Sequence, residues 1–147
     1  MSSSIKNQRA ILDKLSIKEL NEMQKTAKFA IHTNANVVLL SPTGTGKTLA
    51  FLLPIIEELD SECEQIQALI LVPSRELAIQ IEQVAREMGT GFKINAFYGG
   101  QSFSKDRSEL ETPPAILIGT PGRIADHLRR ETFEVTDIKS LILDEFD

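Results

Sequence analysis

The sequence predicts an α/β fold in which helices cover both faces of a doubly wound, mainly parallel sheet. Two observations favour this class: short apolar runs, and helical patterns between them. The runs, four of which are nearly continuous in Val, Ile, Leu and Ala, are 36–41, 68–72, 93–98, 115–120 and 140–145. Such runs are typical of strands buried on both faces of a parallel sheet. Helices are expected at 47–59, 74–88, 121–130 and, more weakly, 103–111. Their alternation with the strands indicates the doubly wound arrangement.

The length and composition of the chain limit how it can be organised into domains. With 147 residues, 41% of them hydrophobic, it is long enough for one domain with its own core, so we expect 1–147 to form a single domain. Cys63 has no Cys or His neighbours at zinc-ligand spacing, and no apolar run approaches the ~20 residues of a membrane helix. We therefore expect a soluble, cytoplasmic protein without membrane contact. The net charge of −5 argues against nucleic-acid binding through bulk charge, but a few arginines and helix N-termini could still provide it.

The first run leads into "SPTGTGKT" (41–48), a loop typical of phosphate binding. Glycine allows a backbone with positive φ that brings N–H groups close to phosphate oxygens, and the following helix presents its N-terminal dipole to the same anion. Lys47 supplies charge for the β- and γ-phosphates, and the Thr48 hydroxyl can ligate Mg²⁺. The alternative is that this loop is only a glycine-rich connection and binds no phosphate. The other positions expected to hold nucleotide are Ser41, Thr43, Gly44, Thr45 and Gly46.

The last run ends in an acidic cluster, "DEFD" (144–147). A carboxylate there can hold Mg²⁺, directly or through water, while its neighbour orients and deprotonates the attacking water. We assign Asp144 to the metal and Glu145 to the water. A polar turn that caps the strand is the alternative, and the phosphate-binding loop upstream favours the catalytic interpretation.

Two other runs end in helix starts that carry an arginine: Pro-Ser-Arg at 73–75 and Thr-Pro-Gly-Arg at 120–123. Each alone is an ordinary helix start with a solvated arginine. Two such N-termini at one sheet edge would nevertheless suit a phosphodiester backbone. The sequence "YGG" (98–100), after the third run, is either a turn or a place where a nucleic-acid strand approaches the backbone closely.

Two remaining features predict surface positions. His32 and His127 have no acidic or serine partner in the sequence that marks them as catalytic, so we expect surface or loop histidines. The charge run at 104–111 is most simply the solvated face of a short helix.

In order, "SPTGTGKT", "PSRELA", "GG", "TPGRI" and "DEFD" resemble motifs I, Ia, GG, Ib and II of the N-terminal RecA-like lobe of DEAD-box ATP-dependent RNA helicases. The resemblance spans roughly residues 20–147, and it accounts for Ser41 because motif I of that family begins with Ala or Ser. It implies a RecA-like P-loop NTPase lobe that binds ATP and Mg²⁺, with Lys47, Asp144 and Glu145 as catalytic residues. Asp147 would link the nucleotide site to interdomain motifs. The positions implied to lie along RNA are Pro73, Arg75, Gly100, Thr120, Pro121, Gly122 and Arg123.

The same resemblance implies that Gln24 reads adenine, because an amide can both donate to and accept from the adenine edge. The match is partial: the usual "PTPIQ" is here "LNEMQ" (20–24), and no aromatic residue stands upstream. Two alternatives stay open. In the first, a helix runs from Ser16 and Gln24 lies on its apolar face. In the second, Gln24 forms a capping box with Asn21.

The resemblance stops at motif II. The "SAT" segment and the second RecA-like lobe, whose arginines stabilise charge on the transferring phosphoryl group, lie outside these residues. We expect the full-length protein to unwind or remodel short RNA duplexes with ATP, and this chain, a partial lobe and a monomer, to bind nucleotide weakly with negligible turnover. The alternatives are a P-loop DNA helicase or translocase lobe, and a non-catalytic nucleotide- or RNA-binding module.

Overall fold

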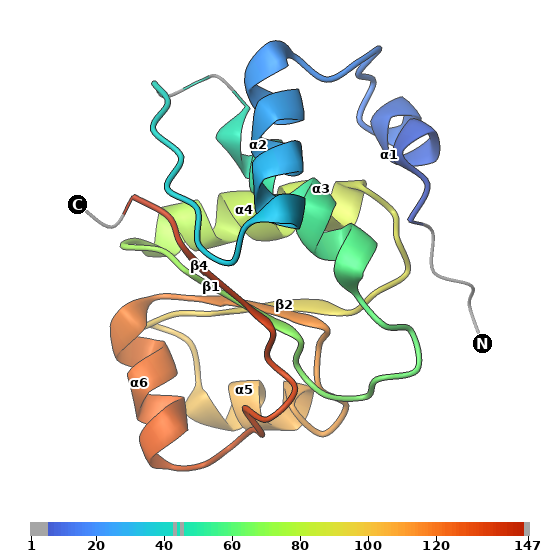
Figure 1. The fold of residues 1–147 in the computed structure, drawn as a ribbon. Coiled ribbons are helices and arrows are strands. Elements are labelled where there is room, and N and C mark those ends of the chain that lie inside the picture. The colour runs from blue at the N-terminus through green and yellow to red at the C-terminus, as the bar shows by residue number, and fades with distance from the viewer. Residues whose placement is uncertain (1–5, 43, 45, 146–147) are drawn as a thin grey trace. The chain divides into compact units, whose positions relative to one another are not determined.

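The computed structural model describes residues 6–42, 44 and 46–145. They belong to two compact units, each of which is described by itself (Figure 1). The units are Met1–Leu59 with Val84–Thr90, and Asp60–Gln83 with Gly91–Asp147.

The regular elements in the described part of the first unit are helices. Its helices are α1 (Gln8–Lys14), α2 (Glu22–Thr33) and α3 (Lys47–Glu58). Asparagine side chains cap α1 and α2 by accepting a backbone N–H three residues on, whereas α3 begins without a side-chain cap. The helix predicted at 47–59 is therefore confirmed as α3. None of the described helices is long and apolar enough to cross a membrane.

The strand predicted at 36–41 is wrong, because the described residues of this segment form a loop. Its apolar side chains are largely in solvent, with Val38 71% and Leu40 88% exposed. A strand forms only where a neighbouring strand can accept and donate its backbone hydrogen bonds. Among the described residues of the first unit there is no strand to provide them. The apolar run alone could not indicate this.

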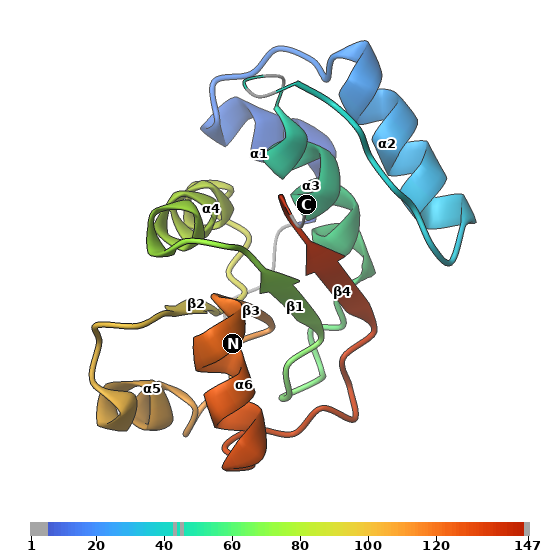
Figure 2. The same cartoon turned by 90° about the vertical axis from the view of Figure 1, so that its left-hand side faces the viewer.

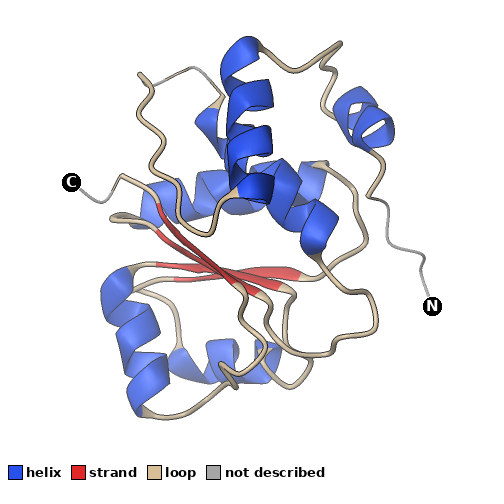
Figure 3. Ribbon diagram, viewed as in Figure 1, coloured by secondary structure: helices blue, strands red, loops and turns tan. Residues whose placement is uncertain are grey.

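The second unit is built on a four-stranded parallel sheet (Figure 3). The strands are β1 (Ala68–Leu71), β2 (Ile94–Phe97), β3 (Ile116–Gly119) and β4 (Ser140–Leu143), in the order β2-β3-β1-β4. Four of the five predicted strands are thus confirmed, each slightly shorter than its apolar run. Strands that follow one another along the chain are parallel, so each is reached through a crossover connection.

Helices lie on both faces of this sheet, as predicted (Figure 2). On one face are α5 (Phe103–Glu109) and α6 (Pro121–Arg129), and on the other is α4 (Arg75–Glu87), whose residues up to Gln83 belong to this unit. The core between the sheet and α5 and α6 is formed by Ile66, Leu69, Phe97, Leu110, Leu117 and Ile124. The predicted helices at 74–88, 103–111 and 121–130 are therefore confirmed.

The buried strands β1, β2 and β3 should dominate the stability of this unit. Leu117→Ala removes a fully buried side chain of β3, and we expect it to lower the free energy of unfolding by about 3 kcal/mol. Leu143→Ala, in β4, is the matched control: its side chain is 49% exposed, and the loss should be about 1 kcal/mol or less. Urea unfolding measures both, and equal losses would contradict the burial described here.

Candidate functional site

The predicted phosphate loop lies in the first unit and leads directly into α3. Gly44 and Gly46 have φ values of 81° and 84°, the left-handed region that only glycine adopts without strain. Gly46 is the N-cap of α3 and no side chain caps this helix, which leaves its first turn suited to an anion. Lys47 and Thr48 form that turn and are half-buried.

The other loop positions are partly described. Ser41 is half-buried at the start of the loop. Thr43 and Thr45, which the sequence also assigns to nucleotide binding, lie outside the described residues.

Gln24 joins α2 to this loop. Its Oε1 accepts from the Asn21 backbone N–H at 2.9 Å, and Asn21 Oδ1 accepts from the Gln24 backbone N–H at 2.8 Å. This reciprocal pair confirms the capping-box alternative, although α2 begins at Glu22 and not at Ser16. In addition, Gln24 Nε2 donates to the Gly46 carbonyl at 3.2 Å. The amide, 7% exposed, thus holds the N-terminus of α2 and the phosphate loop together.

In the second unit, the parallel strands place the residues that follow them at one edge of the sheet, where α/β sheets bind ligands. The edge contains 73–75 after β1, 98–100 after β2, 120–123 after β3 and 144–145 after β4. The backbone N–H of Asp144 donates to the Leu71 carbonyl at 3.0 Å, which fixes the start of the acidic segment. The structure therefore gathers the predicted segments of this unit as the sequence suggested.

The acidic segment is described only in part. Asp144 is half-buried and Glu145 is exposed, with a positive φ of 52°. Asp147 lies outside the described residues. In the described part of the chain, no three His, Cys, Asp or Glu side chains form a metal-binding group.

Arg75 and Gly100 are neighbours at this edge. The Arg75 guanidinium lies over the Tyr98 ring, 5.7 Å from its centroid. Gly100 has a φ of 92°, and a Cβ built on it would lie 3.2 Å from Arg75 Nη1. Ser74 Oγ accepts from the Leu77 backbone N–H at 3.2 Å and so caps the helix start predicted at 73–75. Arg75 and Pro73 are both exposed, so this corner presents a cation beside an open glycine turn.

The start of α6 offers backbone donors at the same edge. Thr120 is its N-cap with extended backbone, and its side chain makes no cap hydrogen bond. Pro121 occupies the first turn, and Gly122 is exposed, with open space where a Cβ would lie. An uncapped N-terminus of this kind suits a phosphate group.

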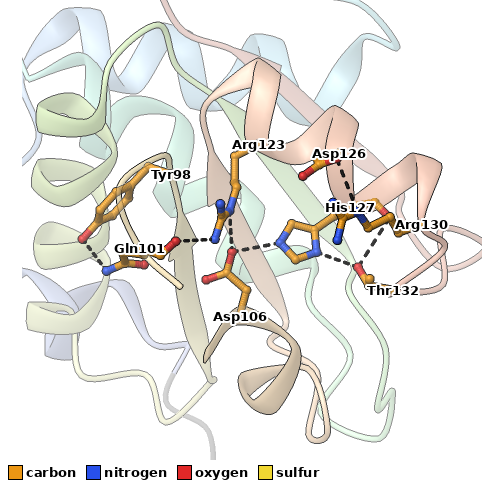
Figure 4. Close-up of polar contacts among 8 residues, drawn as sticks. All are labelled: Tyr98, Gln101, Asp106, Arg123, Asp126, His127, Arg130 and Thr132. Carbon is orange, nitrogen blue, oxygen red and sulfur yellow. Dashed lines mark hydrogen bonds and ion pairs between the residues drawn. The ribbon is translucent and has the colours of Figure 1, made fainter. Parts of the chain in front are cut away.

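Arg123 differs from the other predicted RNA-facing residues because its donors are used inside the unit (Figure 4). Its Nε donates to Asp106 Oδ2 at 2.9 Å, and its Nη2 donates to the Gln101 carbonyl at 2.8 Å. The guanidinium also lies 5.2 Å from the centroid of the Phe103 ring. The side chain is only 14% exposed.

Sequence reasoning missed the buried polar network to which Arg123 belongs. His127 is fully buried and Asp106 is 1% exposed, so the predictions of a surface histidine and of a wholly solvated charge run are wrong. The pairing of α5 with α6 is not visible in either segment alone. One signal was available: the helical spacing of Phe103, Asp106 and Leu110 puts the carboxylate on the apolar face of α5.

His32, by contrast, is exposed as predicted. Its two ring nitrogens lie 3.0 Å from Glu57 Oε2 and 3.0 Å from Glu58 Oε1, at the C-terminal end of α3.

The phosphate loop should not tolerate a side chain at its last glycine. A Cβ on Gly46 would lie 2.4 Å from Gln24 Nε2, at a φ that disfavours every other residue. We expect Gly46→Ala to destabilise the chain by about 1–3 kcal/mol. The control is Gly122→Ala, whose Cβ meets nothing within 4 Å and which should be nearly neutral. Thermal unfolding compares the two, and a neutral Gly46→Ala would contradict the geometry of the loop.

The sequence profile described as DEAD/DEAH box helicase matches residues 21–147. Among curated relatives, the chain is 36% identical over 137 residues to the DEAD-box ATP-dependent RNA helicase CshC of Bacillus cereus, covering 92% of this chain and 35% of the relative. It is 45% identical over 114 residues to the ATP-dependent RNA helicase CshA of Limosilactobacillus reuteri, covering 76% of this chain and 23% of the relative. The chain thus spans about a third or less of the length of these relatives.

Solved structures confirm the fold class. A yeast DEAD-box splicing factor superposes with a TM-score of 0.82 at 27% identity, covering 95% of this chain and 35% of the other. A hypothetical ATP-dependent RNA helicase from Sulfolobus tokodaii superposes with a TM-score of 0.82 at 26% identity, covering 96% and 42%.

Proposed function

Because this chain belongs to the DEAD/DEAH box helicase family, we propose that residues 1–147 act as the N-terminal ATP-binding lobe of an ATP-dependent RNA helicase. In the full-length protein, this lobe couples ATP binding and hydrolysis to unwinding or remodelling of short RNA duplexes. The observation that carries the proposal is the gathering of Arg75, Gly100 and the uncapped start of α6 at one sheet edge. The phosphate loop ahead of α3 supplies the nucleotide half of the function.

In the proposed nucleotide site, the loop backbone and the Lys47 ammonium hold the ATP phosphates. For Mg²⁺, the Thr48 hydroxyl of the first unit and the Asp144 carboxylate of the second unit each offer an oxygen of the kind that this ion prefers. Bound Mg²⁺ would neutralise charge that develops on the phosphate oxygens. Glu145, which is exposed and follows β4, orients and deprotonates the attacking water.

In the proposed RNA site, recognition is directed to the sugar-phosphate backbone. Arg75 supplies a cation, and Gly100 lets an RNA strand approach the turn closely. The N–H groups at the start of α6 donate hydrogen bonds to phosphate oxygens. Contacts of this kind position RNA without reading its sequence. They fit a helicase, which must act on many sequences.

We further propose that residues 1–147 work as one lobe of a cytoplasmic protein and close on RNA together with a C-terminal RecA-like lobe. Asp147 contributes to that interdomain link, and Gln24 contacts adenine. The isolated chain is a monomer under this proposal.

Nucleotide binding should depend on the lysine of the phosphate loop. Lys47→Ala removes the cation that faces the phosphates, and we expect affinity for a fluorescent ADP analogue with Mg²⁺ to fall by about tenfold or more. Lys105→Ala, an exposed lysine of α5, is the control and should bind like wild type. Equal affinity of Lys47→Ala and wild type would overturn the nucleotide assignment.

RNA binding should depend on Arg75. Arg75→Ala should weaken binding of a single-stranded RNA oligonucleotide about equally for different sequences. The slope of log K against log salt should become shallower by about 0.7, as expected for the loss of one phosphate contact. Fluorescence anisotropy at several salt concentrations gives both quantities.

The matched control is Arg129→Ala, at the opposite end of α6, where the side chain is 70% exposed. It should leave affinity and slope nearly unchanged. A DNA oligonucleotide of the same sequence tests the alternative of a DNA helicase lobe: tighter binding to DNA than to RNA would favour that alternative.

A further inference from the structure

We propose that Asp106 is a positioning residue for RNA binding, which holds Arg123 so that Arg123 ties the turn after β2 to the start of α6. The inference rests on the proposed RNA-binding function. It gives Arg123 an indirect role in place of the phosphate contact that the sequence suggested.

Asp106 is the centre of the arrangement (Figure 4). Its Oδ2 accepts from Arg123 Nε and from His127 Nε2, each at 2.9 Å. The carboxylate is 1% exposed, and a charge buried to that degree requires a paired cation and hydrogen bonds to offset its lost hydration. Arg123 supplies the permanent charge. The ion pair therefore fixes one rotamer of the Arg123 side chain.

The other end of the guanidinium reaches the turn after β2. Arg123 Nη2 donates to the Gln101 carbonyl at 2.8 Å, and Gln101 Nε2 donates to the Tyr98 hydroxyl at 2.8 Å. Gly100, with its positive φ, lies between those two residues. Because Arg123 itself stands in the first turn of α6, its side chain connects the two RNA-facing segments of the sheet edge.

His127 fixes the rotation of α6 through the same carboxylate. It follows Arg123 by one helical turn, so Asp106 holds α6 at two points on one face. The ring is stacked on Phe97 of β2 and Phe103 of α5, with centroid distances of 5.0 Å and 4.2 Å. The other ring nitrogen, Nδ1, lies 2.7 Å from the Thr132 hydroxyl.

Direct contact and positioning make opposite predictions for Asp106. If Arg123 bound phosphate itself, removal of the competing carboxylate charge would release the guanidinium and strengthen RNA binding. If Arg123 acts as a tie, the same change loosens the turn and the start of α6, and RNA binding weakens. The 14% exposure of Arg123 and its two internal hydrogen bonds favour the tie.

The test uses Asp106→Asn, which keeps the shape of the side chain, Arg123→Gln, which replaces the guanidinium by a shorter neutral amide, and the double variant. Each single change should weaken RNA binding by about threefold to tenfold. The double variant should bind no more weakly than the weaker single variant, because both residues act through one contact. The salt slope should stay at the wild-type value, since no phosphate contact is lost. Asp126→Asn, a partly exposed carboxylate on α6, is the control and should bind like wild type.

Two further measurements separate positioning from loss of fold. Binding of the fluorescent ADP analogue should be unchanged in all variants, and hydrogen exchange of the amides at 99–102 should be faster in Asp106→Asn. The proposal is overturned if Asp106→Asn binds RNA as tightly as wild type, or if Arg123→Gln makes the salt slope shallower by about 0.7.

The failure of the two proposals can be told apart. If wild type binds RNA and Asp106→Asn binds it equally well, only the positioning role fails. If wild type binds no RNA at all, the proposed function fails, and faster exchange in Asp106→Asn would then reveal a purely structural contact.

Discussion

Parallel pairing of β1 with both of its neighbours is the constraint on which the rest of the second unit depends. In this register Leu71 lies opposite Gly119 on one side and Leu143 on the other, so the three strands end at the same level. Segments that are far apart in the sequence therefore begin side by side, whatever the length of chain between them. An antiparallel partner would send the following residues to the opposite edge. The function proposed for this edge exists only because every strand runs the same way.

The network around Asp106 adds a second constraint, which acts between the helices of one face. Apolar packing of α5 and α6 on the sheet is non-directional and tolerates small shifts in helix position. Asp106, a buried carboxylate that accepts from two side chains of α6, does not tolerate such shifts in helix position. Each shift would leave the charge of the carboxylate unpaired. The stack of Phe97, His127 and Phe103 fills the space around these contacts. Packing thus supplies stability, while the polar contacts specify how α6 presents its first turn.

Local patterns in the sequence sufficed wherever a local cause decides the structure. The four runs that form strands, the helix starts at Ser74 and Thr120, and the positive φ of Gly44 and Gly46 are all indicated by residues within one segment. The failures have a different cause. The run at 36–41 needs a strand partner, and the partners of Asp106 are 17 and 21 residues away on another helix. The apolarity or charge of a residue indicates that it requires burial or a paired group. It does not identify the distant segment that contacts the residue.

Gln24 shows that two local interpretations can both be compatible with one side chain. Its Oε1 has two lone pairs and its Nε2 carries two hydrogens. The Asn21 N–H occupies one lone pair, and the Gly46 carbonyl takes one hydrogen. These two contacts leave the Gln24 amide with one acceptor site and one donor site. Recognition of the adenine edge requires one of each. The capping box and the loop contact fix the amide plane before nucleotide arrives, so an adenine contact would add to the structural role and would not replace it.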